Sequence, residues 1–153
     1  MNTADFRSYH WLVFPGANLR IEREATSPKG NEIIIISGNN AGLVSLGNVL
    51  LAISQSSSDT ESLSITDLPF VHVGGALSLT VVQLMTDEDA GKIVRTDKHD
   101  QFQWQLSDER LEREALNILK VAFTEDGYTP DHYHAYLSPA SDAELLIGRD
   151  NQI

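Results

Sequence analysis

Apolar and polar residues alternate along much of the chain with the two-residue period of a β-strand. The alternation is clearest in residues 101–106 (QFQWQL), where three large apolar side chains alternate with glutamines. Residues 33–36 are instead four consecutive isoleucines. Such a run predicts a central strand that is covered on both faces.

Several turn sequences separate the predicted strands and favour hairpins between neighbours. Three of these turns lie at residues 15–18 (PGAN), 74–75 (GG) and 97–100 (DKHD). The strands expected around them are residues 9–14 with 19–24, residues 70–73 with 77–84, and residues 92–96 with 101–106. A last pair, residues 132–137 and 143–147, flanks the turn at residues 138–141.

Two segments follow the period of an amphipathic helix. Residues 40–54 carry a stripe of four apolar residues, Leu43, Leu46, Leu50 and Ile53. Ser37, Asn39 and Asn40 are the candidate N-caps of this helix. Gly47 lies beside the stripe and is expected to let the helix approach the sheet closely.

The second helix is expected to begin at Ser107, which can cap it, and to end near residues 126–127. Its predicted buried stripe is Leu111, Ala115, Ile118, Leu119 and Ala122. No repeat of fixed period interrupts the pattern, so residues 1–153 are expected to form a single domain. The predicted fold is α+β, with a mostly antiparallel sheet of about seven to nine strands and two amphipathic helices packed on one face.

The charge of the chain changes the functional picture more than its length does. Twenty-two acidic residues against 11 basic ones give a net charge of −11. Such a surface repels nucleic acid and anionic lipid, and it attracts a basic protein partner. The chain has no cysteine, which excludes disulfides and thiolate ligands, and its first residues lack a secretory leader. We therefore expect a cytoplasmic protein.

Residues 37–43 (SGNNAGL) lie between a predicted strand and a predicted helix, where a phosphate site can form. The three glycines of a dinucleotide fingerprint and the Gly-Lys-Ser/Thr ending of a P-loop are both missing. Asn39 and Asn40 favour helix caps and turns. These residues therefore predict scaffold and not a phosphate site.

His132 and His134 project from one face of a predicted strand, as two ligands of one metal ion would. A third ligand would have to come from His72, His99, Asp131 or Asp142. The simpler interpretation places both histidines on an exposed face or at an interface. No G-x-S-x-G pattern indicates a serine nucleophile.

Tyrosine, histidine and acidic residues gather near the C-terminus, and this composition is typical of binding surfaces. The predicted binding residues are Asp126, Tyr128, Asp131, His132, His134, Tyr136, Asp142 and Glu144. An alternative places Tyr133 and Leu137 in the core, facing away from the histidines. No residue is assigned a catalytic role, and no cofactor or metal is expected.

Three motifs, which together cover under a third of the chain, resemble a small family of bacterial polymorphic-toxin immunity proteins. They are residues 38–43 (GNNAGL), residues 132–134 (HYH) and residues 141–147 (SDAELLI). The resemblance implies a cytosolic protein without enzymatic activity that binds a toxin domain and silences it.

The sequence thus favours an acidic binding protein that neutralises a cognate toxin by occluding its active site. Two alternatives remain. One is a metal-dependent hydrolase that uses His132 and His134. The other is a structural or oligomeric domain, such as a homodimer in which residues 9–14 pair between subunits.

Overall fold

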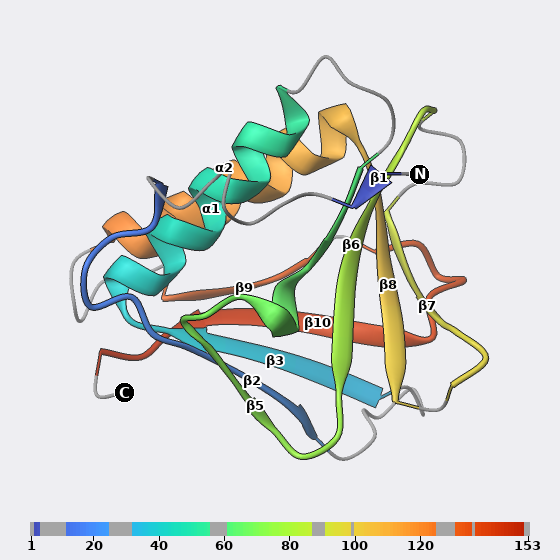
Figure 1. Cartoon of the computed structure of the whole chain (residues 1–153), viewed down its shortest axis with the longest axis horizontal. Coiled ribbons are helices and arrows are strands. Elements are labelled where there is room, and N and C mark those ends of the chain that lie inside the picture. Colours follow the sequence, from blue (N-terminus) through green and yellow to red (C-terminus); the bar gives the residue numbers. More distant parts are fainter. Residues whose placement is uncertain are drawn as a thin grey trace.

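Two mixed β-sheets and two α-helices form the part of the chain that the structure describes (Figure 1). This structure is a computed structural model and describes residues 2–3, 12–24, 32–55, 61–86, 91–98, 100–124, 131–135 and 137–151. The helices are α1 (Asn40–Ser54) and α2 (Asp108–Phe123), and a 3-10 turn, η3, spans Ile65–Asp67. The strands are β1 (Asn2–Thr3), β2 (Leu19–Glu24), β3 (Glu32–Gly38), β4 (Glu61–Ser64), β5 (Val71–Gly74), β6 (Ser78–Leu84), β7 (Lys92–Arg95), β8 (Gln101–Ser107), β9 (His132–His134) and β10 (Ala143–Arg149). The α+β class is confirmed.

The strand pairing corrects the expectation of one mostly antiparallel sheet. Sheet A is five-stranded with the order β1-β4-β6-β8-β7, and sheet B is five-stranded with the order β5-β2-β3-β10-β9. In each sheet parallel and antiparallel pairs alternate, with β6–β8 and β3–β10 as the central parallel pairs. Both sheets are therefore mixed.

Turn signals predicted some hairpins correctly and others wrongly. The pairs β7–β8 and β9–β10 are antiparallel neighbours, as expected. The hairpin expected around Gly74 and Gly75 is wrong, because β5 pairs with β2 in sheet B while β6 lies in sheet A. A hairpin was also expected around residues 15–18. Residues 9–11 of its first strand lie outside the described residues, and residues 12–14 form no strand. Its second strand, β2, pairs with β3. A turn sequence reverses the direction of the chain, but the burial of apolar side chains decides which strands pair with each other.

The topology contains a duplication that the sequence does not show. A hairpin, a helix and two antiparallel strands follow one another twice, first as β2-β3-α1-β4-β6 and then as β7-β8-α2-β9-β10. The strand pair β4–β6 of the first half joins the hairpin of the second in sheet A, and β9–β10 joins the hairpin of the first in sheet B. Each half thus completes the other's sheet.

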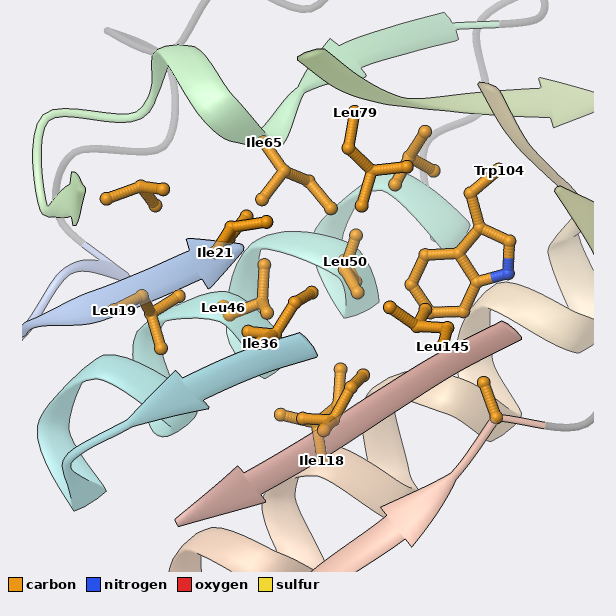
Figure 2. Close-up of a cluster of buried hydrophobic side chains, with 14 of the residues drawn as sticks. Leu19, Ile21, Ile36, Leu46, Leu50, Ile65, Leu79, Trp104, Ile118 and Leu145 are labelled. Carbon is orange, nitrogen blue, oxygen red and sulfur yellow. The ribbon is translucent and has the colours of Figure 1, made fainter. Parts of the chain in front are cut away.

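The two helices pack against each other and bury matching positions. Counted from their caps Asn39 and Ser107, Leu43 corresponds to Leu111, Gly47 to Ala115 and Leu50 to Ile118. Their buried stripes join the inward residues of both sheets in one core around Trp104 (Figure 2). No helix among the described residues is both long enough and apolar enough to cross a bilayer.

Gly47 allows a close contact between the helices and not, as expected, between α1 and the sheet. A Cβ atom at this position would lie 2.8 Å from the side chain of Leu119 and 3.3 Å from the carbonyl oxygen of Ala115, both on α2. Close-packed interiors leave little room for such an atom. The absence of a side chain at Gly47 therefore sets the distance between α1 and α2.

A charge cluster joins the two halves at one end of the core. Arg23 of β2 and Arg95 of β7 both lie over the ring of Phe102, at 5.6 and 4.9 Å from its centroid. Glu32 accepts hydrogen bonds from both guanidinium groups, at 2.5 and 2.9 Å, and Arg23 also binds Asp100 at 2.6 Å. Partial burial raises the pKa of Glu32, but the two arginines outweigh it and hold the pKa below its usual value.

The helix contact predicts that Gly47→Val destabilises the protein by about 1–3 kcal/mol, because the new side chain overlaps Leu119. Urea unfolding followed by circular dichroism would measure the loss. Asn48→Val, on the more exposed side of α1, is the matched control. Adding Leu119→Ala should recover part of the loss, and purely additive effects of the two changes would contradict the proposed contact.

The charge cluster predicts a loss of stability in acid. A carboxyl whose pKa is lowered by folding stabilises the protein above its ordinary pKa of 4.5, and this contribution disappears as the pH falls through the folded-state value. Glu32→Gln should cost about 1–3 kcal/mol at neutral pH and flatten the dependence of unfolding free energy on pH below about 4.5. Glu112→Gln, at an exposed helix position, should do neither.

Candidate binding face

The described helices and strands leave one face of sheet B uncovered, and this outer face is the candidate site. Alternate residues of β2, β3 and β10 belong to the core that α1 and α2 share, so the residues between them point outward. The outward residues of β2, β3, β9 and β10 are Arg20, Glu22, Glu24, Ile33, Ile35, Ser37, His132, His134, Glu144, Leu146 and Gly148, and β5 adds His72 and Gly74.

Three apolar side chains occupy the centre of the outer face. Ile35 pairs with Leu146 across β3 and β10, and Ile33 lies two residues along β3. All three are partly exposed. The expectation that residues 33–36 are covered on both faces is therefore wrong for the described elements, because only Ile34 and Ile36 point into the core.

Acidic and histidine side chains border this apolar centre. On one side, Glu24 and Glu22 of β2 pair with Ile33 and Ile35. On the other side, Glu144 pairs with Ile33, and His134 pairs with Leu146. A hollow of about 210 Å³ opens here, lined by Glu24, Ile33, Ile35, His134, Glu144, Leu145 and Leu146. An apolar centre with a charged border is the usual arrangement of a protein interface.

The outer face of sheet A provides an internal comparison, because the duplication gives each position a counterpart. Matching strand registers relate Ile33, Ile35, Glu144, Leu146 and His134 to Gln101, Gln103, Ser78, Thr80 and Ser64. These five counterparts are polar and uncharged, whereas Glu22 and Gly148 correspond to the apolar residues Val94 and Val82. The same sheet architecture therefore forms with glutamine and threonine at the positions of Ile33, Ile35 and Leu146, so apolar residues at these three positions are not a requirement of the fold.

Three of the eight predicted binding residues come together on the outer face: His132, His134 and Glu144. Asp131 lies at the end of β9, with its Oδ1 2.7 Å from Nδ1 of His132. This hydrogen bond lowers the pKa of the Asp131 carboxyl.

The other four predicted binding residues are not part of this group. Asp142 accepts a 2.7 Å hydrogen bond from the backbone N–H of Arg95, so it connects the start of β10 to β7 in the other sheet. Asp126, Tyr128 and Tyr136 lie outside the described residues.

Tyr133 holds β9 in place from the opposite side and faces away from both histidines. Its hydroxyl donates a 2.8 Å hydrogen bond to Oε2 of Glu114, a residue of α2 that is 3% exposed. Burial raises the pKa of Tyr133 well above its usual value, and the adjacent Glu114 carboxylate adds to the effect. The outward direction of His132 and His134 is thus fixed by an anchored strand.

The two histidines share one face of β9. Their ring centroids are 6.0 Å apart in an edge-on arrangement. Within the described residues, no group of three histidine or acidic side chains is placed to hold one metal ion. His132 and His134 are both exposed side chains of the outer face.

The backbone N–H groups in and around residues 37–43 form hydrogen bonds within the protein. Oδ1 of Asn39 accepts hydrogen bonds from the N–H groups of Gly42, at 2.8 Å, and Asn18, at 3.1 Å, while the Asn40 N–H donates to Asn151 at 3.0 Å. A Cβ atom at Gly42 would lie 2.4 Å from the carbonyl oxygen of Asn18. These contacts use the amides that a phosphate would need, as the structural interpretation predicted.

The apolar centre and the carboxylates of β2 were not predicted from the sequence. Ile33 and Ile35 were hidden in an uninterrupted apolar run, and Leu146 in another. The one available signal was the alternation of residues 19–24 (LRIERE), which marks Glu22 and Glu24 as outward. Because β2 is hydrogen-bonded to β3, that alternation would have indicated a polar neighbour beside the isoleucines.

The Asn39 contacts predict that Asn39→Ala destabilises the protein by about 1–2 kcal/mol through loss of the helix cap. Asn39→Asp keeps the acceptor oxygen but loses the 2.8 Å hydrogen bond that Nδ2 donates to the Gly16 carbonyl, so it should cost less. Thermal unfolding of both variants beside the parent protein is the measurement. Equal losses would contradict a capping role for Oδ1.

Comparison with known proteins gave no match to a family model, to a curated protein or to a solved structure.

Proposed function

We propose that this protein binds a basic protein partner through the outer face of sheet B. The observation that carries the proposal is the contrast between the two sheets. At the positions of Ile33, Ile35, Leu146 and Glu144 in sheet B, sheet A has Gln101, Gln103, Thr80 and Ser78. A sheet exposed only to water would need no apolar centre.

Charge and burial have separate tasks in this proposal. The net charge of −11 attracts a cationic partner over long distances and raises the rate of encounter. Affinity comes from burying Ile33, Ile35 and Leu146, while the polar border excludes water from the contact. Carboxylates of Glu22, Glu24 and Glu144 would pair with the partner's lysines or arginines.

The resemblance to toxin immunity proteins gives this binding a biological role. We propose that the partner is a toxin domain and that the complex occludes its active site in the cytoplasm. Two of the three resembling motifs contribute to the outer face, through His132, His134 and Glu144. The third motif, residues 38–43, caps α1 and supports the scaffold. This role requires no cofactor and no bond-making step by the protein.

The product of the adjacent gene is the natural test partner, and titration calorimetry with both purified proteins measures the interaction. Changing Ile35→Gln and Leu146→Thr gives sheet B the residues of its counterpart in sheet A. We expect this double variant to raise Kd about 30-fold or more, because it removes the apolar centre of the contact.

The control variant is Gln103→Ala with Thr80→Ala, at the corresponding positions of sheet A. Circular dichroism should show that both variants are folded. Unchanged affinity in the control with weakened affinity in the sheet B variant supports the proposal. Absence of any complex, or equal affinity in both variants, contradicts it.

A further inference from the structure

We infer that the partner contributes an amphipathic α-helix to the outer face, with an apolar stripe and basic residues on both of its flanks. This inference rests on the proposed function and specifies which element of the partner is bound. Three properties of sheet B support it: its paired backbone, its width and its length.

The backbone at the centre of the outer face has no free hydrogen-bonding edge. β3 pairs with β2 and β10, and β10 pairs with β3 and β9. A strand of the partner cannot join the sheet there, since strand addition needs an unpaired edge. The partner must therefore contact the centre with side chains alone, from a helix or from the face of another sheet.

The width of the apolar centre fits a single helix. Ile33 is flanked by Glu24 of β2 and Glu144 of β10, which are two strand positions apart. Two strand spacings amount to about 9.6 Å. A helix with its side chains is about 10–12 Å across, so basic residues on its two flanks would reach both carboxylates. A packed sheet would extend beyond this border on each side.

The spacing of the apolar residues along β3 matches the spacing of side chains on one side of a helix. Ile33 and Ile35 are about 6.8 Å apart along β3, close to the roughly 6 Å rise between helix positions i and i+4. Beyond Ile35, the outer face consists of Ser37 and Gly148, which pair with each other and have small side chains or none. Small residues permit the close approach of a backbone. About two and a half helical turns would cover the distance from Ile33 to Ser37.

The carboxylates at the border of the apolar centre determine which charge the partner's helix should carry. Glu22 and Glu24 lie on one side of the apolar centre and Glu144 on the other, so a helix with lysine or arginine on both flanks is complementary. An acidic helix would meet repulsion on each side. An extended basic peptide would pair with the carboxylates but would bury little of Ile33, Ile35 and Leu146.

Synthetic peptides test this inference without the natural partner. The probe is a leucine-lysine peptide of about 18 residues patterned as an amphipathic helix. The first control peptide has the same composition in an order without an apolar stripe, and the second replaces lysine by glutamate. Calorimetry measures Kd, and circular dichroism measures the helix content of the bound peptide.

We expect the patterned lysine peptide to bind at least tenfold more tightly than either control peptide and to gain helix on binding. The Ile35→Gln and Leu146→Thr variant should weaken it at least tenfold. Glu22→Gln and Glu144→Gln should each weaken it severalfold, whereas Asp97→Asn and Glu112→Gln, at exposed positions off this face, should not.

Three results would each overturn the inference. The rearranged peptide could bind as tightly as the patterned one, the bound peptide could gain no helix, or the sheet B variants could leave the Kd of the peptide unchanged. The natural complex separates this failure from failure of the proposed function. If the partner still binds and the Ile35→Gln and Leu146→Thr variant still disrupts that complex, the binding face stands and only the helix is excluded. If the partner does not bind at all, the proposed function fails independently of the peptide result.

Discussion

The parallel pairs β3–β10 and β6–β8 are the contacts on which the rest of this structure depends. Each pair joins a strand from the first half of the chain to one from the second. Without them, each half would be a short hairpin, a helix and two strands with exposed apolar faces, and such a unit buries too little surface to be stable alone. The two halves therefore fold together around one shared core, and α1 packs against α2 at Gly47.

The duplication leaves two outer sheet faces that are free to differ. Inward positions must keep their apolar residues, because both halves share one core. Outward positions carry no such constraint, and there the sheets diverge, with Gln103 and Thr80 on one face and Ile35 and Leu146 on the other. This divergence is the basis of the proposal that the outer face of sheet B binds a partner.

Polar contacts inside the molecule hold that second face in position. Tyr133 and Glu114 attach β9 to α2, and the charge cluster of Arg23, Arg95, Glu32 and Asp100 connects the two hairpins. Neither contact lies on the outer face itself. A surface built on such anchored strands needs little rearrangement on binding, which reduces the entropic cost of forming a complex.

The sequence alone determined the elements governed by local physics. The span of α1, the Ser107 cap of α2, the α+β class and the structural role of residues 37–43 follow from periodicity and capping, which act over a few residues. It also singled out His132, His134 and Glu144, which the structure brings together on the outer face of sheet B. Only the tertiary structure decided the pairing of distant strands, which separated β5 from β6 and placed β3 beside β10. Because a run such as residues 33–36 is apolar on both sides, its sequence cannot tell which side faces the core, and only packing against the helices left Ile33 and Ile35 outside.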